Sequence, residues 1–279
     1  MSLFPERSPT MAILLAIFIS IVITVTPAMA APPDVMTIMN QMKELFEPLR
    51  PSTSKLVITT EHKGERAQFT AVQARKKFPD GKRMLTVMLE PDATRGFALL
   101  AWEPDKKPTV LWVYMPALRR VLELRTVETY EGFFGTEFTY ADLGFIALHE
   151  RYRLVGEEEL TGRHAYKVEE QAPQEQSYYS RIITWIATDS MLPLQRDYFD
   201  RAGRLWKTEL FEASVIDGAP TPVRILMKDI QRQSSTELNV ISVDNNVEIP
   251  DDVFKPELLR EVVNCPLWLK YCPIPPKKK

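Results

Sequence analysis

The sequence has few cysteines, few histidines and no excess of charge of one sign, and each scarcity excludes a class of protein. Its 279 residues include 35 Lys and Arg against 37 Asp and Glu, which leaves a formal net charge of -2. Nucleic-acid-binding proteins usually concentrate cationic side chains to displace counterions from phosphates. The basic clusters here, at 75–77, 119–120 and 277–279, are too short to follow a phosphate backbone. We therefore expect no nucleic-acid partner.

The signatures of the common catalytic sites are missing as well. The sequence contains no G-x-S-x-G elbow, no P-loop, no G-x-G-x-x-G fingerprint and no H-E-x-x-H zinc motif. Ser52 and Lys55 match an S-x-x-K pattern, but the companion S-D-N and K-T-G elements are absent. The three histidines, His62, His149 and His164, have no ligand spacing between them. We expect no enzyme, no cofactor and no metal site, and keep a hydrolase using the S-x-x-K serine as an alternative.

The first thirty residues differ in character from the rest. There is no charged residue between Arg7 and Asp34, the run 11–25 is mostly apolar, and an A-x-A step follows at 28–30. This arrangement is typical of a cleaved secretory signal peptide, which we expect at 1–30. The alternative is an uncleaved membrane anchor, but a helix of that run reaches only about 22 Å, short of a hydrocarbon core of roughly 30 Å.

Both cysteines, Cys265 and Cys272, lie in a C-terminal tail at 263–279. An exported protein meets an oxidising environment, so we expect a disulfide between them. Two lone thiols with no histidine nearby make a poor metal site. The bridge would close a small loop on the tail and would not crosslink the domain.

One amphipathic helix is predicted at about 34–47, and strands follow it. Asp34 can cap this helix, and its apolar stripe is rich in methionine, as at Met39 and Met42. The stripe either covers a β core or lines a surface that accepts variable apolar ligands. Short β-rich runs between turn signals then predict an antiparallel meander over about 55–247. The expected strands are 55–62, 65–77, 82–90, 95–103, 109–115, 118–125, 148–158, 163–171, 180–189, 194–200, 204–216, 221–230 and 236–244.

Two of these strands and one interruption stand out from the simple meander. The runs 84–89 and 110–115 are apolar on both faces, so both faces need cover. Either a sheet wrapped around a helix or a curved sheet holding an apolar ligand would provide it. The segment 131–145 places aromatic residues among glycines, with Thr139 and Asp142 spaced as a capping box for a short helix. Such a loop either plugs the sheet permanently or moves as a lid.

Three stretches carry a family resemblance when they are read together and in order. They are LWVYMPALRRVLEL at 111–124, FFGTEFTYADL at 133–143 and IPDDVFKPELLR at 249–260. Together they resemble the outer-membrane lipoprotein-sorting protein family, the LolA-like proteins of the bacterial periplasm, over about 55–260. The resemblance implies a mainly β, α+β fold: a strongly curved, incomplete antiparallel β-barrel, or half-barrel, with a helical lid over a hydrophobic cavity.

The resemblance also implies one domain over 31–262, closed by a short helix at about 251–260, and a place in the periplasm of a Gram-negative bacterium. We expect a monomeric carrier or chaperone that binds the acyl chains of a lipoprotein, or a lipid, for outer-membrane lipoprotein sorting or lipid transport. Its candidate partners are an inner-membrane transporter and an outer-membrane acceptor. The alternative is a structural or interaction protein of the cell envelope, or an accessory partner of a lipid exporter of the resistance-nodulation-division type.

The cavity and lid of such a carrier would be lined by large apolar side chains. An arginine helps to control the lid in the family, and Arg119 and Arg120 lie in a matching motif with neither assigned that role. Ordinary core packing is the competing interpretation for every lining candidate. The candidates are Met39, Met42, Met88, Phe97, Leu99, Trp112, Tyr114, Phe133, Phe134, Phe138 and Trp185.

Overall fold

A computed structural model describes most of the chain after the expected leader. The leader at 1–30, Cys272 and most of the tail lie outside the described residues. None of the helices within the described ranges has the length and apolar character needed to cross a membrane. The described residues are 33–45, 50–105, 107–125, 131–143, 151–171, 178–216 and 218–265.

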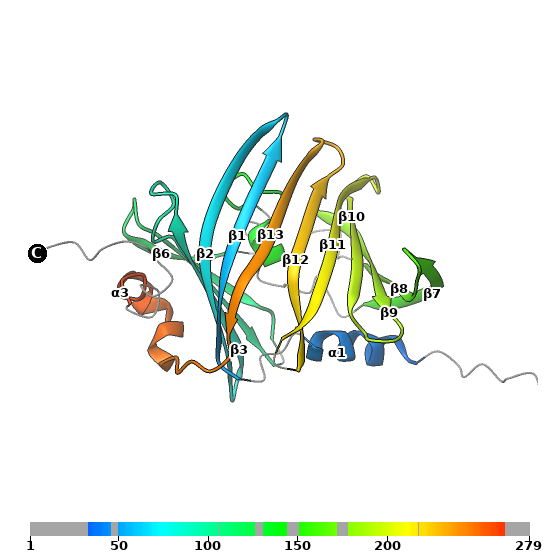
Figure 1. The fold of residues 1–279 in the computed structure, drawn as a ribbon, viewed down its shortest axis with the longest axis horizontal. Coiled ribbons are helices and arrows are strands. Elements are labelled where there is room, and N and C mark those ends of the chain that lie inside the picture. The colour runs from blue at the N-terminus through cyan, green and yellow to red at the C-terminus, as the bar shows by residue number, and fades with distance from the viewer. Residues whose placement is uncertain are drawn as a thin grey trace, which may run out of the picture. The chain divides into compact units, whose positions relative to one another are not determined.

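Thirteen strands form one antiparallel sheet, in the order β6-β5-β4-β3-β2-β1-β13-β12-β11-β10-β9-β8-β7. The sheet is unclosed and strongly curved, as Figure 1 shows, so the predicted half-barrel meander is confirmed. The strands are β1 Ser52–His62, β2 Glu65–Phe78, β3 Gly81–Glu90, β4 Ala98–Pro104, β5 Val110–Met115, β6 Arg120–Leu124, β7 Tyr152–Leu160, β8 Arg163–Gln171, β9 Tyr179–Ala187, β10 Pro193–Asp200, β11 Leu205–Ile216, β12 Ala219–Asp229 and β13 Ser234–Asp244.

The strand order makes the chain cross the sheet once. From β1 to β6 each strand pairs with the one before it, and from β7 to β13 the chain returns to the centre, where β13 pairs with β1. The connection between β6 and β7 therefore joins the two edges of the sheet. The aromatic segment 131–143 lies on this connection, and α2 (Tyr140–Leu143) appears behind the central strands in Figure 1.

Local backbone preferences explain the tight turns between strands. His62 faces Glu65 across the first hairpin, and the two residues between them, Lys63 and Gly64, have φ values of 51° and 85°. Two positive φ values define the primed turn whose twist matches antiparallel strands. Gly81 opens β3 with φ 135°, and a Cβ there would lie 2.2 Å from the carbonyl oxygen of Glu103. Only glycine fits that position.

Both faces of β3, β4 and β5 are covered, as their sequences require. Side chains alternate between faces along a strand. On the concave face the strands contact the aromatic segment, and on the outer face they contact the chain that follows β13. That chain comprises the 3-10 helices η2 (Asp251–Phe254) and η3 (Pro256–Leu258) and the helix α3 (Leu259–Val262). The outer cover thus comes from the C-terminal elements.

The N-terminal helix covers a different part of the sheet. Helix α1 spans Val35–Leu45, and the Asp34 carboxylate accepts a hydrogen bond of 3.0 Å from the Met36 amide, as expected for a cap. The helix contacts both β7 and β12, which lie on either side of β8 to β11 in the sheet. It therefore spans one end of the curved sheet (Figure 1).

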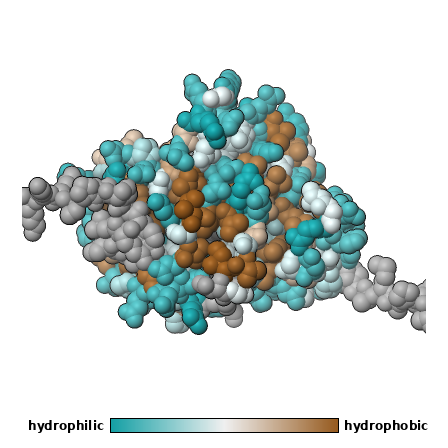
Figure 2. Space-filling model, viewed as in Figure 1, coloured by the Kyte–Doolittle hydropathy of each residue, from teal (hydrophilic) through white to brown (hydrophobic). Residues whose placement is uncertain are grey.

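Figure 2 shows the outer face in the same view as Figure 1. Apolar side chains lie among hydrophilic ones over the central strands. The outer face is therefore neither one continuous apolar patch nor uniformly polar.

Candidate functional site

The candidate site is the concave face of the sheet together with the segment 131–143, here called the aromatic loop. Phe133 and Phe138 of this loop are 1% and 3% exposed, within the main hydrophobic cluster of the concave face. The rings of Phe133 and Phe134 lie 6.0 Å and 4.7 Å from the ring of Phe97, both edge-on. The loop thus fills part of the concavity with aromatic side chains.

The aromatic loop has an internal structure that the sequence predicts. The Thr139 amide donates to the Asp142 carboxylate at 2.8 Å, and the Asp142 amide donates to the Thr139 hydroxyl at 3.1 Å. These reciprocal bonds are the predicted capping box, which is confirmed. The Phe133 amide also donates to the carbonyl of Phe138 at 2.9 Å, which closes the loop on itself. The loop is therefore a small folded unit.

Polar contacts attach this unit to the sheet. The Lys207 ammonium of β11 lies 3.4 Å from the Asp142 carboxylate, and the Tyr179 hydroxyl of β9 donates to the same carboxylate at 3.1 Å. At the other side of the loop, the Glu137 amide donates to the Thr236 hydroxyl of β13 at 3.0 Å, and that hydroxyl donates to the Glu137 carboxylate. If the aromatic loop moved off the sheet, these buried polar groups would need other hydrogen-bond partners.

A second buried polar group lies beside this attachment. The Tyr198 hydroxyl donates to the Glu209 carboxylate at 2.5 Å, and the Arg196 guanidinium lies 3.8 Å from it. Burial raises the pKa of Glu209 to about 7, against the opposing effects of Arg196 and Tyr198. Burial likewise raises the pKa of Tyr179 well above its ordinary value, so its hydroxyl remains a hydrogen-bond donor. The concave face is therefore apolar on one side and hydrogen-bonded and charged on the other.

Six of the predicted lining residues meet on the concave face. Phe134 is partly buried at the tip of the aromatic loop, with a left-handed φ of 48°, and the other five are buried in the same hydrophobic cluster. All six remain lining candidates. They are Met88, Phe97, Leu99, Phe133, Phe134 and Phe138.

Three other candidates point to the opposite face of the sheet. Trp112 and Tyr114 belong to the outer cluster under the C-terminal elements, because alternation along β5 sends their neighbours Leu111 and Val113 to the concave face. By the same alternation, Trp185 of β9 points to the face opposite that of its two neighbours in the strand. Its indole donates a hydrogen bond to the Glu158 carboxylate.

Met39 and Met42 are buried under α1, against side chains of β8 and β9. They form a separate cluster, but alternation along β9 puts Ile186 of this cluster on the same face as Ile182 of the main one, so Met39 and Met42 also lie on the concave side.

Sequence reasoning missed the polar residues that hold the aromatic loop. Lys207 and Glu209 are 3% and 4% exposed, although charged residues in a strand usually face water. The available signal was their spacing: both share a face of β11 with Phe211, which packs on the main cluster. Their partners come from distant strands, which no local pattern reveals.

The remaining predicted residues form no further site in the described part of the chain. Ser52 and Lys55 lie on β1, where alternation over three positions directs their side chains to opposite faces. Among the described residues, no group of three His, Cys, Asp or Glu side chains could hold a metal ion. His149 lies outside those residues.

Two further predictions concern the tail and the matching arginine motif. Cys265 is partly buried beside the outer cluster and has no sulfur partner among the described residues. The disulfide with Cys272 stays a prediction, because Cys272 lies outside them. Arg119 and Arg120 are exposed at the turn between β5 and β6.

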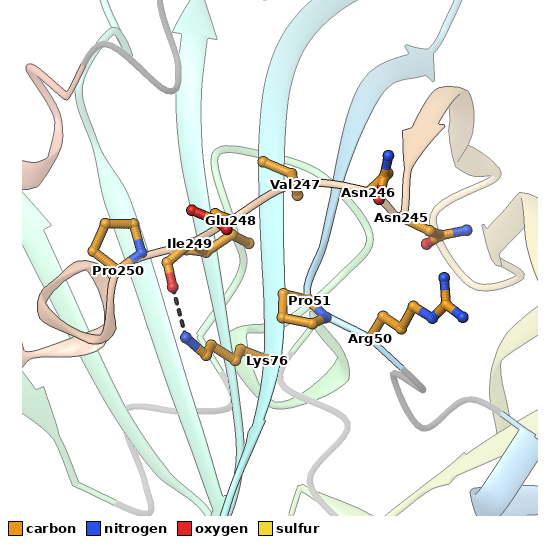
Figure 3. Close-up of a pocket in the computed structure, with 9 residues that line it drawn as sticks. All are labelled: Arg50, Pro51, Lys76, Asn245, Asn246, Val247, Glu248, Ile249 and Pro250. Atoms are coloured by element: carbon orange, nitrogen blue, oxygen red, sulfur yellow. Dashed lines mark hydrogen bonds between the residues drawn. The ribbon is translucent and has the colours of Figure 1, made fainter.

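A pocket of about 510 Å³ lies away from the concave face (Figure 3). Lys76 lines this pocket. Its ammonium donates a hydrogen bond to the carbonyl of Ile249 at 2.6 Å and forms an ion pair with Asp251 at 2.7 Å. These bonds attach the C-terminal elements to β2, so the pocket lies at a structural junction. It is lined by Arg50, Pro51, Lys76, Asn245, Asn246, Val247, Glu248, Ile249 and Pro250.

Comparison with known proteins gives the same fold. A family model described as an uncharacterized protein matches residues 80–261, from the turn before β3 to α3. A candidate outer membrane lipoprotein-sorting protein domain from Vibrio parahaemolyticus is 22% identical, with a TM-score of 0.74 over 81% of this chain and 97% of that one. No curated protein matches the sequence.

Two other solved structures agree. A DUF1329 family protein from Desulfovibrio piger is 23% identical, with a TM-score of 0.72 over 80% of this chain and 96% of that one. A LolA superfamily protein from Nitrosomonas europaea is 19% identical, with a TM-score of 0.64 over 80% and 98%. At these identities the likeness establishes the fold, and the predicted resemblance is confirmed at that level.

Proposed function

Because this chain belongs to a family of uncharacterized proteins with the LolA-like fold of outer membrane lipoprotein-sorting proteins, we propose that it is a periplasmic carrier for the acyl chains of a lipoprotein or a lipid. The observation that carries the proposal is the aromatic loop, a folded unit lying on the apolar concave face and attached to it by a few polar contacts. Such a unit can leave the face without unfolding the sheet.

The physical need for such a carrier is large. Each methylene of an acyl chain left in water costs about 0.8 kcal/mol, so a long chain costs on the order of 10 kcal/mol to expose. The concave face offers buried apolar side chains such as Met88, Phe97 and Leu99 in exchange. Only binding and release are required, and no chemical step. The leader expected at 1–30 would deliver the protein to the periplasm, and the carrier would act between an inner-membrane donor and an outer-membrane acceptor.

A structural protein of the cell envelope, or an accessory partner of a lipid exporter, is the second candidate. It is favoured by the way the aromatic loop fills the concavity with its own rings, since Phe133 is 1% exposed. In that case the loop would be a permanent part of the core.

Identification of copurifying lipid separates the two candidates. The full chain is purified from the periplasm, and native mass spectrometry and lipid extraction are applied to it and to Phe134→Lys, which places a charge on the concave face. Val215→Lys is the control, because Val215 is already 71% exposed. The carrier proposal expects an amphiphile bound to the wild type and the control and reduced in Phe134→Lys. An empty wild-type protein that also fails to bind added lipid would contradict it.

A further inference from the structure

The buried ammonium of Lys207 forms its ion pair with a carboxylate of the aromatic loop. Lys207 is 3% exposed, and its nitrogen lies 3.4 Å from the Asp142 carboxylate and 3.1 Å from the Tyr179 hydroxyl. The rings of Trp206 and Tyr179 lie beside it, at 4.8 Å and 5.5 Å. A buried ammonium without an anion is strongly unfavourable. Displacing the loop therefore requires another anion at this position.

The neighbouring acidic residue does not replace Asp142. The Glu209 carboxylate accepts the Tyr198 hydroxyl at 2.5 Å and has the Arg196 guanidinium 3.8 Å away. Burial also raises the pKa of Glu209 to about 7, so at neutral pH a large fraction of this carboxyl is uncharged. The close partners of Glu209 are therefore Tyr198 and Arg196, and Lys207 acts on its charge only from a greater distance.

Two donors converge on the Asp142 carboxylate. The Tyr179 hydroxyl lies 3.1 Å and 3.2 Å from its two oxygens, and the Lys207 ammonium approaches one of them. A cation and a hydroxyl aimed at one group of oxygens suit a carboxylate or a phosphate. A neutral hydroxyl or ester would leave the ammonium without a counter-charge.

The apolar part of the loop is continuous with this charged end. Tyr179 belongs to the same hydrophobic cluster as Phe97, Phe133 and Phe138. The loop thus presents one carboxylate and a run of aromatic side chains to the concave face. An anionic amphiphile has the same two features, a charged head and an apolar tail.

We propose that Lys207 and Tyr179 form a binding site for the anionic head of an amphiphile, and that the Asp142 carboxylate occupies this site in the structure. The inference rests on the proposed carrier function and specifies its ligand: the head replaces Asp142 while the tail replaces the rings of Phe133 and Phe134. A fatty-acid carboxylate and a phospholipid phosphate both supply negatively charged oxygens of this kind, and the test distinguishes the two sources.

The test compares pairs of probes that share their hydrocarbon chains, one with an anionic head group and one with a neutral head group. Palmitate is compared with 1-hexadecanol, and dipalmitoyl phosphatidic acid with dipalmitoylglycerol, by titration of the full chain at pH 7.5. We expect at least one anion to bind about tenfold more tightly than its neutral counterpart, and the pair showing the preference identifies the source of the head group. The variant Asp142→Ala removes the competing carboxylate. It should bind the same anion about tenfold more tightly than the wild type does.

Lys207→Met should abolish the preference for the anion while the neutral probe still binds. The control is Lys228→Met, which removes an exposed lysine of the neighbouring strand β12 and should keep the preference. Asp142→Ala keeps the test decisive if Lys207→Met does not fold. Equal binding of anionic and neutral probes by the wild type and by Asp142→Ala would overturn the anion site and leave the carrier function intact. Failure of all four probes to bind would contradict the carrier function itself.

Discussion

The ammonium of Lys207 lies 3.4 Å from the carboxylate of Asp142, and both side chains are 4% exposed. This ion pair joins strand β11 to a loop that crosses between the edges of the sheet. Its burial makes it different from the surface pairs of the same protein, such as Arg163 with Asp189, whose side chains are 38% and 69% exposed.

The buried pair should show strong energetic coupling. Asp142→Asn or Lys207→Met alone leaves one buried charge without its partner, at an expected cost of about 3 kcal/mol in the free energy of unfolding. The double variant should lose less free energy of unfolding than the two single variants together, by at least about 1 kcal/mol. Urea denaturation of the four proteins measures this coupling. Asp189→Asn is the surface control and should change stability little, because exposed ion pairs contribute weakly. Additive losses would show that the pair does not hold the loop.

Glu209 should make stability depend on pH between about 4.5 and 7. Its pKa is raised by burial from 4.5 to about 7, so over this range the folded protein keeps a proton that the unfolded chain releases. The contribution of Glu209 to stability is therefore greatest below pH 4.5 and falls as the pH rises to 7, by about 3 kcal/mol. Asp200, whose pKa is lowered to about 2 chiefly by the backbone amide of Arg204, has the opposite effect only in more acidic solution.

Glu209→Gln keeps the neutral form and removes the titration. Denaturation at several pH values should show that the difference in stability between wild type and Glu209→Gln changes over this window. A constant difference from pH 4.5 to 7 would mean that the carboxyl titrates normally.

Gly81→Ala tests the tight turn that begins β3. The position combines φ 135° with an approach of 2.2 Å between a new Cβ and the Glu103 carbonyl oxygen, so we expect a loss of about 3 kcal/mol or more. Gly64→Ala is the matched control, because φ is also positive there but no atom lies within 4 Å of the new Cβ. Its loss should be about 1 kcal/mol. Equal melting temperatures for the two variants would refute the steric explanation.

The C-terminal elements should contribute to stability by covering the outer face. Phe254 is 2% exposed, and its ring meets that of Phe78 edge-on at 5.6 Å. Phe254→Ala should cost about 3 to 4 kcal/mol in chemical denaturation, as for other buried aromatic residues. Leu118→Ala, at a side chain that is 59% exposed, should cost less than about 0.5 kcal/mol. A small loss for Phe254→Ala would mean that the segment packs only loosely.

The sequence predicts the strands well because their signals are local. The turn at Lys63 and Gly64 and the apolar runs at 84–89 and 110–115 depend on neighbouring residues, and the structure places strands there. The capping box of Thr139 and Asp142 is local too, and both of its hydrogen bonds form.

The partners across the sheet could not be predicted in the same way. Asp142 meets Tyr179 and Lys207, residues 37 and 65 positions along the chain, because the strand order brings β9 and β11 under the loop. For lining residues, the sequence identifies large apolar side chains but not the face. Trp112 and Phe97 are equally good candidates from composition, and only the pairing of the strands separates the outer face from the concave one.

The most direct test of the carrier proposal is photo-crosslinking of the full chain with a diazirine analogue of palmitate, followed by mass-spectrometric mapping of the adducts. The proposal predicts adducts on the concave face and the aromatic loop, at residues such as Met88, Phe97 and Phe134, and their loss when unlabelled palmitate is added. Adducts confined to the outer face, for example at Trp112 and Tyr114, or no adducts that unlabelled palmitate removes, would contradict it.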